Sequence, residues 1–156
     1  LMGSQIVAVR SAMVAALRLL PAYTTTGPTG QKPDVQFGWK ANWKRREKVW
    51  TQRARFTHEP ASIRAGKTFT NETGEFDLMI FVHGVGITQE ATSERAAALA
   101  SDAWDWAQTH ANWQALDLGL YEFLIVGDGQ IPEAVDSTGA PMAEIQLPVR
   151  YRARLE

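Results

Sequence analysis

Residues 76–82 have the sequence Phe-Asp-Leu-Met-Ile-Phe-Val, and a helix-forming stretch begins a few residues later, near Thr88. The first run is apolar at nearly every position, which is typical of a central strand that is covered on at least one face. Gly84 and Gly86 allow the chain to turn after it. We expect this strand and this helix to pack together, so that the rest of the chain must supply more sheet and a second cover.

The helix is predicted to run from about Thr88 to Gln108. Its apolar residues recur at spacings of three and four and therefore share one face. They are Ala96, Leu99, Ala103 and Trp106, with Ala100 and Ala107 beside them. The opposite face is polar, and Thr88 with Glu90 gives a capped start with an acidic residue in the first turn.

The composition indicates one domain, residues 1–156, without metal or cofactor. The chain has 156 residues, of which 45% are hydrophobic and six are Trp, which is enough for a core. Cysteine is absent, which excludes disulfides and thiolate zinc sites, and the histidines at 58, 83 and 110 lack ligand spacing. We also expect no membrane span and no signal peptide, and hence a cytosolic site of synthesis.

Further elements follow from periodicity. Residues 4–20 are predicted to form a helix that ends at Pro21, and strands are predicted from about Asp34, at 48–57, at 119–126 and at 143–155. The predicted order is helix, strand, strand, strand, helix, strand, strand. This order favours an α+β fold with a mixed or antiparallel sheet of about five strands and both helices on one face.

The last predicted strand has the clearest alternation of apolar and polar residues in the chain. Its polar positions include Arg150, Arg152 and Arg154, so one face is buried and the other carries charge. Pro148 cannot donate a backbone hydrogen bond, and we therefore expect this strand to lie at an edge of the sheet or to carry a bulge.

Long loops are predicted at residues 22–33, 59–74 and 127–141. The second has sixteen residues with little regular pattern, and connections of that length are usually functional or disordered. We expect it to be mobile in a free subunit and to become ordered against a neighbour, with Ile63 and Phe69 as anchors.

The charge is distributed unevenly although the net charge is only -1. Residues 1–70 hold twelve Lys and Arg against three Asp and Glu, a charge of +9, whereas residues 71–156 hold four against fourteen, a charge of -10. One interpretation is that these charges fold back onto each other as solvated faces. The other is self-association, in which a basic face of one subunit meets an acidic face of the next.

The basic segment 40–46, Lys-Ala-Asn-Trp-Lys-Arg-Arg, lies between the first two predicted strands and is expected to project from the fold, because it is too charged to be buried. Cations beside Trp39, Trp43 and Trp50 also suggest single-stranded nucleic acid, although tryptophans at strand spacing are more often core residues. A protein contact is the commoner explanation. The carboxylates of Glu72, Glu75 and Asp77 are expected to face solvent or to receive a neighbour's cations.

Catalytic groupings are not recognisable. The sequence has no Walker A loop, no Gly-x-Ser-x-Gly, no His-Glu-x-x-His and no Cys nucleophile. Residues 127–129, Gly-Asp-Gly, are similar to part of a calcium loop, but Gln130, Ile131 and Pro132 follow where ligands should stand, so a turn is predicted. His83 is interpreted as a core or edge residue. We predict neither an enzyme nor a cofactor.

In its order of elements the chain resembles the tail terminator proteins of long-tailed, non-contractile bacteriophages, across almost its whole length. The stretches that carry the resemblance are the helix 6–17, the strand 35–38, the strand start 46–50, the strand 74–82, the helix residues 94–96 and the alternating final strand. The connection 40–48 and the loop 59–74 are longer than expected, and they leave open which face they serve.

The resemblance implies a homohexameric ring that caps the finished tail tube, stops its elongation and presents a surface to head completion proteins. It also implies a place in the virion, at the head–tail junction, after assembly in the host cytoplasm, with DNA only passing through the channel and no membrane contact. Alternatives are a head completion or tail tube protein and a nucleic-acid-binding domain. The residues expected at subunit or partner interfaces are Lys40, Trp43, Lys44, Arg45, Arg46, Ile63, Phe69, Glu72, Glu75, Arg150, Arg152 and Arg154.

Overall fold

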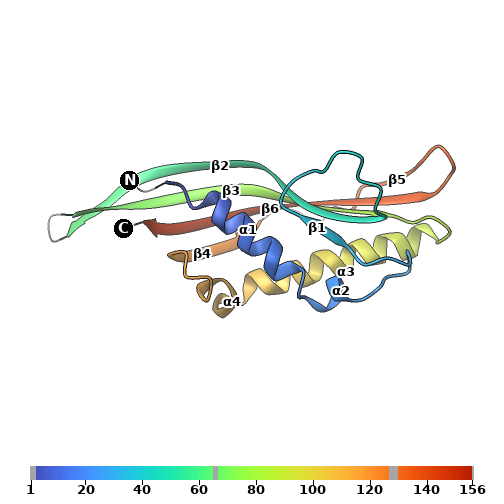
Figure 1. Ribbon diagram of the computed structural model, residues 1–156, viewed down its shortest axis with the longest axis horizontal. Helices are drawn as coiled ribbons and strands as arrows, with labels where there is room; N and C mark the ends of the chain where they lie inside the picture. Colours follow the sequence, from blue (N-terminus) through green and yellow to red (C-terminus); the bar gives the residue numbers. More distant parts are fainter. Residues whose placement is uncertain (1–2, 65–66, 127–129, 156) are drawn as a thin grey trace.

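The computed structural model describes residues 3–64, 67–126 and 130–155, with the backbone alone for residues 61–64 and 67–68. Figure 1 shows an elongated subunit in which long strands run along the length of the molecule and the helices lie together on one side of the sheet. The fold is α+β with a mixed sheet, as the sequence predicts.

The elements alternate much as expected, with two extra short helices and one extra short strand. The helices are α1 (Ile6–Leu17), α2 (Pro21–Thr24), α3 (Gln89–Gln108) and α4 (His110–Gln114). The strands are β1 (Asp34–Gln36), β2 (Glu47–Arg64), β3 (Lys67–His83), β4 (Leu120–Ile125), β5 (Glu133–Val135) and β6 (Pro141–Leu155). The sheet order is β1-β2-β3-β6-β4, with β5 also on β6; only β1 and β2 pair in parallel.

The main core lies between the sheet and the helices. Alternate residues of β3, among them Leu78, Ile80 and Val82, face α1 and α3 and are fully buried. On α3 the predicted apolar face is buried, and the Thr88 hydroxyl caps the helix by accepting a hydrogen bond from the Ala91 N–H at 3.1 Å. The prediction for the strand and the helix that decide the fold is confirmed.

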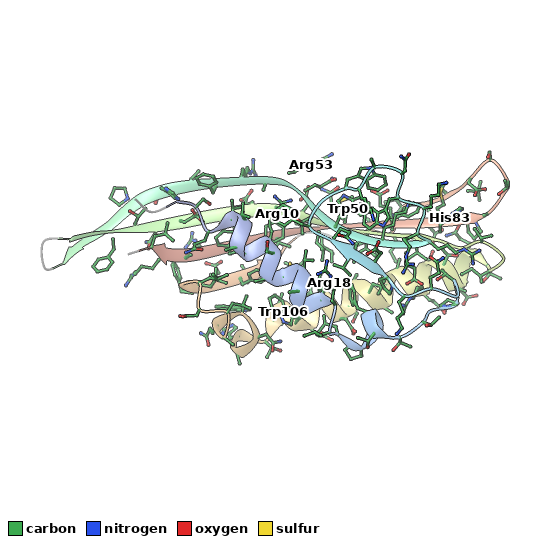
Figure 2. All side chains as sticks on the ribbon, in the orientation of Figure 1. Arg10, Arg18, Trp50, Arg53, His83 and Trp106 are labelled. Atoms are coloured by element: carbon green, nitrogen blue, oxygen red, sulfur yellow. The ribbon has the colours of Figure 1, made fainter. Side chains whose placement is uncertain are left out.

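The opposite face of the sheet has its own small apolar cluster. Met79 and Phe81 point to this side, where Trp43 and Trp50 pack on them. The segment 40–46 was predicted to project because of its charge, and this is wrong for Trp43, whose residue is only 6% exposed. The indole anchors the segment to the sheet, while the cations around it remain in water. Trp50 and Trp106 accordingly lie on opposite sides of the sheet (Figure 2).

The predicted loop 59–74 is wrong. The pairing of β2 with β3 continues from Glu59↔Asn71 as far as Arg64↔Lys67, and the ribbon extends past β6, whose last partner is Thr70 (Figure 1). Threonines, an isoleucine and a phenylalanine in this stretch favour strand. Gly74 lies within β3, where only a glycine fits, because an added Cβ would come within 2.2 Å of the Tyr151 ring. We call residues 59–64 and 67–70 the arm.

Pro148 was predicted to place the last strand at an edge or to cause a bulge, and both alternatives are wrong: β6 is an interior strand, and its register with β3 runs through Pro148 without a shift. β6 lies between β3 on one side and β4 and β5 on the other. Pro148 is tolerated because β4 ends beside it: the Val126 N–H donates to the Pro148 carbonyl at 2.7 Å, so the missing Pro148 N–H points to the same side, past the end of β4. The other predicted loops change less. Residues 22–24 belong to α2, β5 lies within 127–141, and residues 127–129 are outside the described chain.

Candidate functional site

The connection between β1 and β2, residues 37–46, forms a basic cap on the side of the sheet opposite the helices (Figure 1). The Asp34 carboxylate holds it by accepting from the Trp43 Nε1–H at 2.8 Å and from the Gln36 amide at 2.7 Å. The Trp39, Trp43 and Trp50 rings contact one another edge to face, with centroids 5.0 to 5.7 Å apart. The cap is therefore an ordered platform.

Three cations of the basic cap are exposed. Lys40, Lys44 and Arg45 line a hollow of about 490 Å³ together with Asp34, Asn42 and Trp43. Partial burial opposes ionisation of Asp34, but the two hydrogen bonds and the positive charge of Arg45 and Lys40 outweigh it and lower the pKa of Asp34. Within the described chain, no ion pair involves these three cations.

Arg46 differs from its neighbours. Its guanidinium donates to the Thr29 carbonyl at 2.8 Å, and its backbone N–H donates to the Gln31 side chain at 2.8 Å. Arg46 is half-buried and anchors the segment 25–33. Beside it lies a buried ion pair, in which Arg95 donates to Glu47 at 2.6 Å. Arg46 is thus bound inside its own subunit, whereas the other three cations remain available to a partner.

The exposed face of α3, on the helix side of the sheet, is acidic. Glu90, Glu94 and Asp105 are exposed there, and none of them takes part in an ion pair in the part of the chain that the structure describes. The one basic residue of α3, Arg95, is buried. The sequence predicted this polar face, but not that it lies across the sheet from the basic cap.

Between these two surfaces, the outer face of the sheet carries internally paired charges. Arg55 binds Glu75, Arg53 lies 4.0 Å from Asp77, and Glu122 lies 3.7 and 3.5 Å from Arg150 and Arg152. Arg53 projects from the side opposite the helices (Figure 2), beside a hollow of about 450 Å³. Arg154 is exposed, opposite Asn71. In the pairs of Arg53 and Arg55, charges of the two chain halves do fold back onto each other, whereas Glu122 pairs with cations of its own half.

Glu72 was expected to face solvent, and this is wrong. It is fully buried on the helix side, where it accepts hydrogen bonds from the Gln5 N–H at 2.9 Å and from the Tyr151 hydroxyl at 2.5 Å, and lies 2.5 Å from His58 Nε2. Burial, and then Glu72, raise the pKa of Tyr151. Strand alternation contains the missed signal, because Glu72 is in phase with the buried Phe76 and Leu78.

Two predicted anchors lie on the arm. Phe69 is half-buried on β3, and Ile63 belongs to the part of β2 described by its backbone alone. A strand was predicted at 48–57, but sequence reasoning missed that every residue from 53 to 60 is exposed on both faces of β2. Eight consecutive exposed strand residues indicate a surface that the subunit itself does not cover.

His83 packs at the end of β3, where its Nε2 lies 2.6 Å from Asp136 Oδ2 in the β5–β6 turn. Among the described residues no group of three His, Cys, Asp or Glu side chains is placed to hold a metal ion. In the same part of the chain no helix is long and apolar enough to cross a membrane. Comparison of the sequence with models of known protein families and with curated proteins finds no match.

Proposed function

We propose that the protein is a structural subunit that associates head to tail into a ring, as a tail terminator that caps a phage tail tube and stops its elongation. The observation that carries the proposal is the separation of charge: the basic cap and the acidic α3 face lie on opposite sides of one sheet, both exposed and both outside the ion pairs of the described chain.

Separated surfaces of opposite sign favour a head-to-tail contact over a two-fold dimer. In a two-fold contact the same patch meets itself, so the basic cap would face another basic cap. In a head-to-tail contact the basic cap of one copy meets α3 of the next, and each copy offers both surfaces once. Such contacts close into a ring when the rotation between copies closes.

The arm supports a role in assembly. It is a two-stranded ribbon that extends beyond β6, and isolated two-stranded hairpins are marginally stable in water. A neighbour or the end of a tube would cover it. In the proposed particle the partners are the tail tube protein on one ring face and a head completion protein on the other, with DNA passing through the channel. The site of action would be the virion, at the head–tail junction.

Charge reversal tests the proposal. Variant 1 carries Lys40→Glu, Lys44→Glu and Arg45→Glu; variant 2 carries Glu90→Lys, Glu94→Lys and Asp105→Lys. Each should associate more weakly, because losing three exposed pairs at about 0.2–1 kcal/mol each raises Kd about 3- to 150-fold, before the repulsion is counted. Sedimentation analysis of mass against concentration measures this.

The mixture of the two variants is the matched control. Variant 1 offers a negative cap to the positive α3 of variant 2, and the remaining contact is native, so the mixture should associate again. Tail attachment to heads should follow the same pattern. Unchanged particle mass in both single variants, together with unchanged infectivity, would contradict the proposal.

Two alternatives have specific signatures. A tail tube protein stacks without limit, so filaments of the purified chain in negative-stain images would favour that role, and a head completion protein would bind heads before tails. The nucleic-acid alternative is favoured by Trp39, which is 60% exposed and has the Lys48 Nζ 5.2 Å from its ring centroid. Retention of single-stranded DNA that falls steeply with salt and is lost in Trp39→Ala would support it.

A further inference from the structure

The sheet has two open edges at the same end of the subunit. β1 covers the outer edge of β2 only as far as Thr51, and β4 pairs with β6 alone in the described structure. One row of residues joins the edges across four strands, namely Thr57, Thr73, Arg152 and Glu122. The two open edges therefore stand opposite each other, at the same level of the sheet.

We infer that these edges pair between copies, so that β4 of one subunit adds to residues 55–59 of β2 in the next and the sheets continue around the ring. The inference rests on the self-association that the proposed function requires, and it names the contact. In a continuous sheet the helix sides of neighbouring copies face the same way, so this contact is an alternative to that between the basic cap and α3.

The two edges match in length. On β2 a register shift between Gln52 and Arg55, with Arg53 at a φ of 56°, marks one end of the regular stretch, and a second shift after Pro60 marks the other. The register is regular from Arg55 to Pro60, and because Pro60 has no N–H to donate, residues 55–59 remain for pairing, against the six residues of β4. Irregularities and charges protect an edge against unspecific pairing, and between them only a short partner strand fits.

The backbone groups that would pair follow from the alternation of the ladder. The N–H and C=O of one strand residue point to the same side. The Val126 N–H donates to Pro148 of β6, so the backbone groups of the even-numbered residues at this end of β4 point to β6. The N–H and C=O groups of Phe123 and Ile125 therefore point to the open edge. On β2, the Thr51 N–H points to the outer edge, where it donates to the Phe37 carbonyl. The register shift after Gln52 reverses the alternation, so beyond it the backbone N–H and C=O groups of Phe56 and His58 point to the outer edge.

The side chains beside the edges are complementary. Phe56 is 48% exposed and, paired opposite Gly74, lies on the helix side of β2. On the helix side of β4 a hollow of about 280 Å³ is lined by Trp104, His110 and Phe123 among others. In a continuous sheet, Phe56 of one copy would lie over the hollow of the next. The charges at the two edges, Glu122 on β4 and Arg55 on β2, are already paired within the subunit, so the complementarity rests on Phe56 and the hollow.

Strand direction agrees with this arrangement. β2 with β3, β3 with β6, and β6 with β4 are all antiparallel, so β2 and β4 run in opposite directions. A rotation about an axis along the strands preserves strand direction in every copy. β4 then meets the next β2 antiparallel, which is the more stable pairing, and each copy uses two different edges, as a ring requires.

Disulfide trapping tests the inference without a background, because the chain has no cysteine. Four double variants combine Arg55→Cys or Thr57→Cys with Glu122→Cys or Leu124→Cys, all on the outer face of the sheet. Mild oxidation at high concentration should give, in at least one of them, a ladder of linked species that ends at the ring size. The control Ser11→Cys with Leu124→Cys, whose first residue is exposed on α1, should give no ladder.

Hydrogen exchange provides a readout independent of the cysteines. The amides of Phe56, His58, Phe123 and Ile125 should become at least ten-fold slower to exchange when wild-type protein is concentrated into oligomers. Association without β2–β4 linkage and without this protection overturns the edge pairing and leaves the proposed function standing. If the cysteine variants are cross-linked and the edge amides are protected, but charge reversal does not change the association, the contact between the basic cap and α3 alone is refuted. A chain that stays monomeric at every concentration overturns the edge pairing.

Discussion

Truncation of Glu72 to alanine would leave two donors without their partner, the buried Tyr151 hydroxyl and the half-buried Gln5 N–H at the start of α1. The Gln5 N–H and the Tyr151 hydroxyl both donate to Glu72 Oε1, and Tyr151 is fully buried. A buried donor left unsatisfied costs about 1–3 kcal/mol, and the lost side chain adds a cavity. We expect Glu72→Ala to lower the free energy of unfolding by about 3–5 kcal/mol, which at about 2–4 °C per kcal/mol corresponds to a Tm decrease of roughly 6–20 °C.

The informative comparison is the double variant. In the wild-type chain, Tyr151→Phe removes a hydrogen bond to a carboxylate and should cost about 1.5–3 kcal/mol. In the Glu72→Ala background the same exchange removes a stranded hydroxyl, and it should cost nothing or restore stability. The coupling energy between the two sites is therefore expected to be about 2 kcal/mol.

Urea unfolding followed by tryptophan fluorescence measures all four free energies, with equal m-values as the check that the unfolded states are comparable. Because association also stabilises the folded chain, the four proteins are compared at one low concentration. Costs that add to within about 0.5 kcal/mol would refute the shared hydrogen-bond network, and with it the assignment of Glu72 to the subunit interior.

Two further outcomes follow from the geometry. Gly74→Ala should lower the thermal midpoint of unfolding, because its Cβ would lie 2.2 Å from the Tyr151 ring, at a cost of about 1–3 kcal/mol or more. The control is Gly38→Ala, where no atom lies within 4 Å of the added Cβ and the midpoint should not change. Equal midpoints for the two variants would contradict the packing described for Tyr151. The pKa of Asp136 lies well below 3.8, because the carboxylate accepts hydrogen bonds from the Thr138 hydroxyl, the Ala140 and Thr138 N–H groups and His83, and these outweigh the effect of partial burial. The ionised carboxylate therefore stabilises the β5–β6 turn fully above pH 3.8, and this stabilisation is lost only as the pH falls further. The side-chain carboxyl carbon resonance of Asp136 should keep the chemical shift of a carboxylate down to pH 4 and move below it, and a protonation transition centred near pH 4 would show that Asp136 has no such stabilisation.

Periodicity was sufficient to predict the elements whose environment is simple. Residues 76–82 are apolar on both faces because helices cover one side and the basic cap the other, and α3 begins at the predicted cap because Thr88 binds its first turn. The three exposed cations of the basic cap were predicted to be exposed because they are charged, and the structure confirms this. Burial of Trp43 was missed, because a single indole can anchor a segment whose other side chains remain solvated.

Relations between distant elements could not be predicted in the same way. Pro148 indicated an edge, but its effect depends on where β4 ends, and nothing local to residues 143–155 contains that information. Residues 59–74 were predicted as a loop because they lack a regular pattern, but their pairing depends on distant contacts: Gly74 makes room for the Tyr151 ring, and Pro60 lies on the outer strand of a ribbon. Glu72 was taken for a surface group because its donors, Gln5 and Tyr151, lie far away in sequence.

The position of β6 has a consequence for synthesis. It lies between β3 and β4 in the sheet, yet both of these strands leave the ribosome before it. Until its fifteen residues arrive, the nascent chain exposes two apolar strands with no intervening partner, a state prone to join the strands of other chains. Chaperones would bind the nascent chain in that interval, and chains stopped before β6 should accumulate in the insoluble fraction.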